Sequence, residues 1–160
     1  MATHDTDHLR NVVLLSHSGA GKTILSEAAL FATKATTRLG RVEDETTTSD
    51  YEPEEHKRQN SVQTSVLLVI HGDYKINLID SPGYADYRGE VVSALRAADA
   101  ALILVSAPSG VEVGTIQMWQ MAEDLPKLIV VSKLDRENSD FERVMAVSYT
   151  HLTLPTKRIV

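Results

Sequence analysis

The sequence predicts an α/β fold with a mostly parallel sheet, one antiparallel hairpin strand and helices on both faces. Short apolar, β-branched runs alternate along the chain with segments whose apolar residues recur at helical spacing. One turn signal, His71-Gly72-Asp73-Tyr74, directly separates two such runs, which is typical of a hairpin. Strands joined through helices favour parallel pairing, with ligands at their carboxyl ends.

The strands and helices can be placed in chain order from these periodicities. A run over 11–15 predicts the first strand, and alternation over 62–70 followed by the run over 75–79 predicts the hairpin. Later elements are expected as helices over 87–98 and 113–122 and strands over 100–107 and 128–131. A helix over 23–31 is expected to bury Ile24, Leu25, Ala28 and Phe31.

The segment over 34–60 has no apolar periodicity and is rich in acidic residues and threonine. A loop of this length inside a compact domain is usually functional or disordered. Two interpretations stay open, a solvated insertion and a loop that becomes ordered on a γ phosphate.

Composition limits the classes of function. With 160 residues, 42% of them hydrophobic, the chain suffices for one domain with a core. The absence of cysteine excludes disulfides and cysteine nucleophiles, and the apolar runs are too short to cross a bilayer. A formal net charge of −6 argues against a broad basic face for nucleic acid. A cytoplasmic protein without a membrane partner is expected.

A phosphate-binding loop is indicated by Ser-His-Ser-Gly-Ala-Gly-Lys-Thr over 16–23, where the first strand meets the first helix. The pattern is G-x-x-x-x-G-K-[ST], except that Ser16 replaces the first glycine. Gly19 and Gly21 allow backbone N–H groups to approach a phosphate at a helix N-terminus. Lys22 would reach the β and γ phosphates, and the Thr23 hydroxyl would ligate Mg²⁺. The candidate nucleotide contacts here are His17, Ser18, Gly19, Ala20, Gly21, Lys22 and Thr23.

This loop predicts a P-loop NTPase fold with a nucleoside triphosphate site, against the alternative of an ordinary Gly-containing turn. A second motif, Asp80-Ser81-Pro82-Gly83-Tyr84, follows the hairpin. Asp80 ends an apolar strand, where a carboxylate can hold Mg²⁺ through water, and Gly83 can present its N–H to the γ phosphate. A simple Pro-Gly turn is the alternative, which the accompanying loop makes improbable.

A third motif, Ser132-Lys133-Leu134-Asp135, ends the last strand and resembles the [NT]-K-x-D signature of GTPases. The Asp135 carboxylate can accept hydrogen bonds from N1–H and the amino group of guanine, whereas adenine would leave it unpaired. The aliphatic stem of Lys133 would cover the base. Asp135 thus argues against a P-loop ATPase. Taken alone, this motif could also be a strand-to-helix turn that binds no ligand.

Taken together, these motifs resemble the GTP-binding domain of elongation factor G, and especially elongation factor G-like proteins. The resemblance covers roughly 10–141 and rests on the segments 16–23, 80–84, 97–101 and 132–135, with 40–55 similar to the family's first switch. It implies a GTP-driven conformational cycle on the ribosome, with GTP or GDP and Mg²⁺ as cofactors. Ribosomal protection proteins and peptide chain release factors share these motifs, so both classes remain as alternatives.

The resemblance also implies roles for two divergent residues. Ser61 stands where the family has a threonine that ligates Mg²⁺, and it keeps the hydroxyl. Tyr84 stands at the catalytic position, where most members have the histidine that orients the attacking water. Tyrosine can bond a water but cannot act as an imidazolium, so hydrolysis is expected to be weak or ribosome-dependent. A nucleotide-dependent binding switch with little hydrolysis is the alternative function.

The family pattern also sets the expected domain boundaries. Residues 1–145 are expected to form a partial GTP-binding domain, incomplete at its C-terminus because the family has a further strand and helix. Ribosome contacts are expected through the switch regions and through domains outside this sequence. Residues 146–160 depart from the pattern and are interpreted as a non-native tail, with a C-terminal strand as the alternative.

Overall fold

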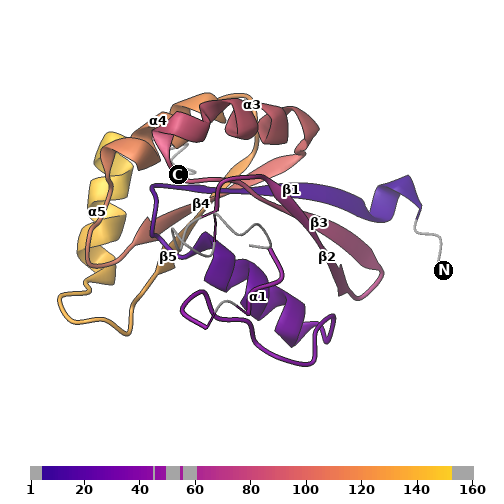
Figure 1. Cartoon of the computed structure of the whole chain (residues 1–160). Coiled ribbons are helices and arrows are strands. Elements are labelled where there is room, and N and C mark those ends of the chain that lie inside the picture. The colour runs from indigo at the N-terminus through magenta and orange to yellow at the C-terminus, as the bar shows by residue number, and fades with distance from the viewer. Residues whose placement is uncertain (1–4, 45, 50–54, 56–60, 153–160) are drawn as a thin grey trace, which may run out of the picture.

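The computed structural model describes residues 5–44, 46–49, 55 and 61–152 (Figure 1). Five strands form one sheet in the order β2-β3-β1-β4-β5. The strands are β1 (Leu9–Ser16), β2 (Ser65–His71), β3 (Tyr74–Asp80), β4 (Ala100–Ser106) and β5 (Lys127–Ser132). The α-helices are α1 (Lys22–Ala32), α3 (Arg88–Ala97), α4 (Val113–Met121) and α5 (Phe141–His151), with short 3-10 helices η1 (Thr6–His8) and η2 (Ala85–Tyr87).

The strand pairing confirms the predicted fold class. β1 lies at the centre and pairs in parallel with β3 and β4, and β4 pairs in parallel with β5. β2 pairs with β3 in the antiparallel direction, with His71 opposite Tyr74. Gly72 in the connecting turn has a φ of 58°, a conformation that favours glycine in two-residue hairpin loops. The carboxyl ends of β1, β3, β4 and β5 therefore share one edge of the sheet.

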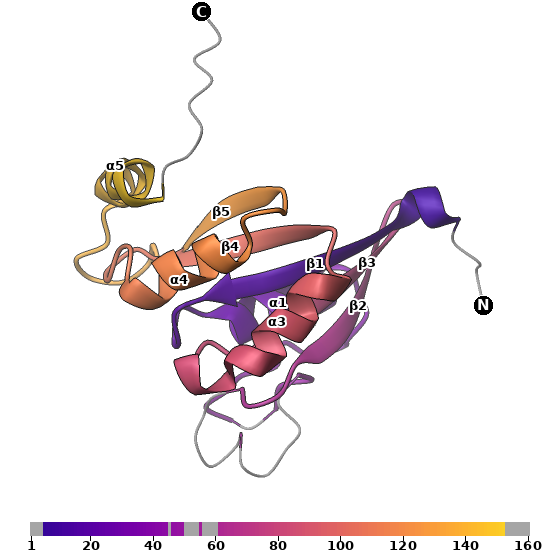
Figure 2. The same cartoon turned by 90° about the horizontal axis from the view of Figure 1, so that it is seen from above.

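Helices cover both faces of the sheet, as predicted (Figures 1 and 2). Val13 and Leu15 of β1 are buried with Val91 of α3 and Met118 of α4. On the opposite face, Leu30 of α1 packs with residues of β2 and β3. Because successive residues of a strand point to opposite faces, the apolar run of β1 supplies both cores. No helix among the described residues is long and apolar enough to cross a membrane.

The predicted buried side of α1 is wrong at three of its four positions, whereas Leu25 packs against a core cluster as expected. Ile24 is 42% exposed and Phe31 is 48% exposed, and Ala28 is exposed as well. The side of α1 that faces the protein combines apolar Leu25 and Leu30 with polar Ser26 and Glu27. Helical spacing of apolar residues does not reveal buried polar positions. The buried residues of α1 are Lys22, Ser26, Glu27 and Leu30.

The last described helix crosses the expected boundary at residue 145. Asp140 caps α5 by accepting a hydrogen bond from the Arg143 N–H at 2.9 Å. Residues 146–151 continue this helix, and Ser148 and Leu152 are buried. The described part of the expected tail is therefore helical rather than a strand, and 153–160 lie outside the described residues.

Candidate functional site

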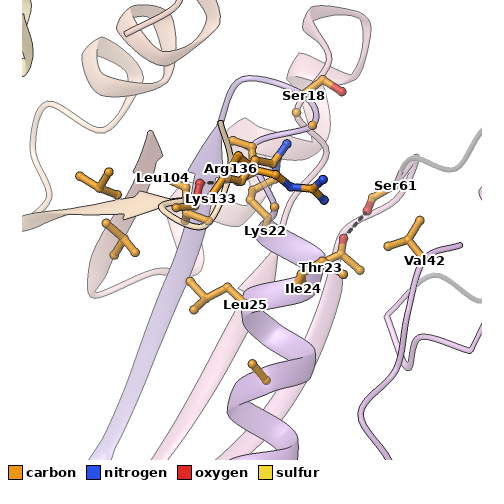
Figure 3. Close-up of a pocket in the computed structure, with 18 of the residues that line it drawn as sticks. Ser18, Lys22, Thr23, Ile24, Leu25, Val42, Ser61, Leu104, Lys133 and Arg136 are labelled. Carbon is orange, nitrogen blue, oxygen red and sulfur yellow. Dashed lines mark hydrogen bonds between the residues drawn. The ribbon is translucent and has the colours of Figure 1, made fainter. Parts of the chain in front are cut away.

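A cavity of about 620 Å³ opens at the carboxyl edge of the sheet, beside the N-terminus of α1 (Figure 3). Residues from all three sequence motifs line it, although they lie far apart in the chain. Ser132 also links two of the motifs directly, since its hydroxyl donates to the Ala20 carbonyl at 2.7 Å. The motif residues in the lining are Ser18, Gly19, Ala20, Gly21, Lys22, Thr23, Gly83, Tyr84, Ser132, Lys133 and Asp135.

The loop between β1 and α1 has the backbone that the phosphate-loop motif requires. Gly19 and Gly21 adopt positive φ values of 75° and 99°, which other residues rarely adopt. Lys22 is 7% exposed, and its ammonium donates to the Ser16 hydroxyl at 2.9 Å. Ser16 in turn donates to the His17 carbonyl at 2.6 Å. The residue that departs from the motif therefore helps to orient the lysine.

Gly83 lies directly against the phosphate-binding loop. A Cβ at this position would lie 2.7 Å from the Lys22 ammonium and 2.9 Å from both the Cα and the backbone nitrogen of Ser18. Real Cβ atoms essentially never show contacts this short, and backbone atoms cannot swing away as a side chain can. The absence of a side chain is therefore what allows the β3 loop to contact the phosphate-binding loop.

Replacing Gly83 by alanine is expected to weaken nucleotide binding and to destabilise the fold. Overpacking of this kind costs about 1–3 kcal/mol of unfolding free energy. Denaturant unfolding and equilibrium binding of GDP measure the two effects. Gly89→Ala is the matched control, because a Cβ there meets nothing within 4 Å. Equal behaviour of the two variants would contradict a close contact between the loops.

Three oxygen-bearing side chains meet below the phosphate-binding loop. The Thr23 hydroxyl lies 3.2 Å from Oδ2 of Asp80. It also lies 3.3 Å from the Ser61 hydroxyl (Figure 3). Asp80 is 1% exposed, and Ser26 donates to the same Oδ2 at 3.4 Å. Two hydroxyls and one carboxylate are hard oxygen donors, which fit Mg²⁺ when it also binds nucleotide phosphates. These residues could hold the ion, and Ser26 is a participant that the sequence analysis missed.

The third motif forms the opposite wall of the cavity. Lys133 has a φ of 58°, and the Asp135 side chain is 82% exposed at the cavity mouth. Arg136 also lines the cavity, with Nε 3.8 Å from Oδ2 of Asp135. An exposed pair of this kind contributes little free energy, so it leaves Asp135 available to a ligand. No sequence motif marks Arg136.

Two predicted site residues, His17 and Asp80, are absent from the cavity lining. The His17 imidazole faces α4, with Nε2 3.6 Å from Glu112, and it packs against Gly114. Its side chain is absent from the cavity lining, although its backbone belongs to the loop. Tyr84 is 45% exposed and lies at the cavity wall. The apolar lining that the sequence analysis assigned to the core comes from Ile24, Leu25 and Ala28.

A glycine-rich strand-to-helix loop with a buried lysine, and an aspartate ending the neighbouring strand, define a P-loop nucleotide-binding protein of the α/β class. The chain belongs to the elongation factor Tu GTP binding domain family, which matches residues 7–157. This match shows a GTP-binding domain of the elongation factor type.

Relatives confirm the resemblance to elongation factor G-like proteins. The elongation factor G-like protein of Mycobacterium tuberculosis (strain ATCC 25618 / H37Rv) is 39% identical over 142 residues, which cover 88% of this chain and 20% of that protein. The mitochondrial ribosome-releasing factor 2 of Candida albicans is 36% identical over 138 residues, 85% of this chain and 17% of that protein. A crystal structure from Thermus thermophilus has a TM-score of 0.86 at 45% identity and covers 89% of this chain and 22% of that chain.

These figures show that the chain spans about a fifth of the length of the relatives it matches. The shared part is the GTP-binding domain, so family membership and fold apply to this chain directly. What the longer relatives do as whole proteins is a separate question.

Proposed function

We propose that this chain is the GTP-binding and GTP-hydrolysing part of an elongation factor G-like translation factor, which couples the GTP cycle to conformational change on the ribosome. The observation that carries the proposal is the convergence of Lys22, Gly83 and Asp135, one residue from each motif, on one cavity, whose lining residue Thr23 bonds Asp80. The names of the relatives, an elongation factor G-like protein and a ribosome-releasing factor, support the ribosome as partner. Cytoplasm is the expected location.

Each group of residues has a distinct task in this proposal. Backbone N–H groups over 18–21 and the Lys22 ammonium bind the phosphates, and Gly83 offers its N–H to the γ phosphate. Thr23, Ser61 and Asp80 hold Mg²⁺, which when bound neutralises charge that develops on the phosphates. Asp135 selects guanine, with Ser132 supporting the loop and Lys133 covering the base. His17 contributes its backbone and braces the loop against α4 through Glu112.

Tyr84 favours a second candidate function, a nucleotide-dependent switch with little hydrolysis. Its hydroxyl can bond a water at the cavity wall but cannot supply an imidazolium near neutral pH. The two candidates share the binding site and differ only in turnover. The relative named ribosome-releasing factor 2 supports a role in ribosome release as an alternative for the full-length protein.

Replacing Tyr84 by histidine is expected to raise GTP turnover in the presence of ribosomes. A positioned histidine contributes about 10²–10⁴-fold in general acid–base catalysis, so an increase of roughly tenfold or more is expected. Phosphate release at saturating GTP measures it. Tyr149→His, at an exposed position of α5, is the control. Unchanged or lower turnover would argue against a water-orienting role for residue 84.

The proposed nucleotide site can be tested by thermal unfolding with Mg²⁺ and GDP, ADP or neither. A ligand at a hundredfold excess over its dissociation constant adds about 2.7 kcal/mol to the unfolding free energy. For a chain of 160 residues that corresponds to a shift of roughly 5–11 °C in the midpoint. Stabilisation by GDP alone supports the proposal, and stabilisation by ADP, or by neither nucleotide, overturns it.

A further inference from the structure

Glu27 is a buried carboxylate to which the proposed nucleotide chemistry gives no task. It lies on α1 one helical turn after Thr23, so the two side chains share one side of the helix. Its side chain is only 1% exposed. A carboxylate removed from water is costly unless polar partners satisfy it, so the identity of its partners is informative.

The partners of Glu27 belong to the loop between α1 and β2. Oε1 accepts a hydrogen bond from the Thr48 N–H, and Oε2 lies 3.3 Å from the Thr48 hydroxyl. Gly40 packs against the same carboxylate so closely that a Cβ there would overlap with Oε2. Thr46 closes this part of the loop, since its N–H donates to the Arg41 carbonyl at 3.1 Å. One side chain of α1 therefore contacts the loop at two points, Gly40 and Thr48.

The far end of the same loop leads to the candidate Mg²⁺ site. Glu55, also 1% exposed, accepts hydrogen bonds from the Val62 and Gln63 N–H groups at 2.8 and 3.1 Å. These residues directly follow Ser61, whose hydroxyl lies 3.3 Å from that of Thr23. Ser61 is the one candidate Mg²⁺ ligand that belongs to the loop, because Thr23 lies on α1 and Asp80 on β3.

We propose that Glu27 is a positioning residue that fixes the α1–β2 loop to α1 and thereby keeps Ser61 beside Thr23. The part of this inference that concerns Mg²⁺ rests on the proposed function, whereas the attachment of the loop does not. Loss of the carboxylate would free the loop and remove one ion ligand, while Lys22 and the guanine-binding residues would stay in place. Glu27 thus acts on the ion only through the loop.

The experiment compares wild type with Glu27→Gln and Gly40→Ala, which disturb one contact from its two sides. Asp44→Asn, an exposed carboxylate of the same loop, is the control. The first readout is the rate of trypsin cleavage after Arg38 and Arg41 without nucleotide, well below the unfolding midpoint of every variant. The second is the Mg²⁺ concentration that gives half-maximal stabilisation by GTP, with GDP binding measured in parallel.

Both Glu27→Gln and Gly40→Ala are expected to accelerate cleavage while Asp44→Asn does not. They are also expected to raise the half-maximal Mg²⁺ concentration about tenfold, the lower end of the effect of residues that orient metal ligands. Unchanged cleavage, or faster cleavage with an unchanged Mg²⁺ requirement, overturns the inference. If Glu27→Gln fails to fold, Gly40→Ala decides, because it alters no charge and lies in the loop. If wild type binds neither nucleotide, the proposed function fails, and unchanged or accelerated cleavage still decides whether Glu27 fixes the loop.

Discussion

Replacing Lys22 by methionine is expected to abolish measurable binding of GTP and GDP. Lys22 is 7% exposed, and its ammonium donates to the Ser16 hydroxyl at 2.9 Å and lies against Gly83. Truncating one partner of a buried, hydrogen-bonded charge pair costs about 2–5 kcal/mol, or roughly 30-fold to 4,000-fold in affinity. Methionine keeps an unbranched side chain, one heavy atom shorter, without the charge. Equilibrium binding of a fluorescent guanine nucleotide measures the loss.

The control for this variant is Lys75→Met, at the start of β3 and the opposite edge of the sheet from the cavity. Unfolding of the nucleotide-free protein verifies that the Lys22 variant keeps its fold. Binding within about threefold of wild type, less than 1 kcal/mol, would mean that the phosphates do not contact Lys22. The phosphate-site interpretation would then be wrong even though the loop has the expected backbone.

Replacing Asp135 by asparagine is expected to change the preferred base from guanine to xanthine. The carboxylate offers two acceptors to the N1–H and amino group of guanine, whereas the amide offers one acceptor and one donor. This pair matches the N1–H and C2 carbonyl of xanthine. In the variant, bound guanine would leave a polar group without a hydrogen-bond partner, and such unpaired groups strongly disfavour binding. A loss of GDP affinity of about 10²-fold or more is therefore expected.

Competition among GDP, xanthosine diphosphate and ADP for the site measures this change in base preference. The Asp135 side chain is 82% exposed without a ligand, so the unfolding free energy should change by less than about 0.5 kcal/mol. Asp124→Asn, at an exposed position after α4, is the matched control. Unchanged GDP affinity in the Asp135 variant would show that the base binds elsewhere than at the end of β5.

Sequence reasoning predicted the fold class, the order of the strands and helices from β1 to β5, and the three motifs, but not α5. Strand and helix boundaries differ from prediction by only a few residues, such as β2 at Ser65–His71 against 62–70. These features are local: a glycine-rich turn, an apolar run and a terminal aspartate each lie within a few consecutive residues. Ligands bind at the carboxyl ends of parallel strands, and this rule predicted that the three motifs would lie close together.

The features that escaped prediction depend on contacts between distant segments. Arg136 follows a motif without belonging to it, and Ser26 has its partner Asp80 54 positions further along the chain. The His17 side chain faces α4 because Glu112 and Gly114 lie there, which nothing near position 17 indicates. The exposed Ile24 and buried Glu27 of α1 reverse the expectation from apolar spacing.

The sequence by itself determined the class of site, because phosphate, Mg²⁺ and guanine each require particular groups that short motifs carry. Only the tertiary structure decided which side of α1 is buried and where the carboxylate of Glu27 finds its partners. The physical reason is that a polar side chain can be buried only where remote segments supply its hydrogen-bond partners. The local pattern of apolar residues does not predict those partners. Thr48 supplies those partners here through its N–H and its hydroxyl.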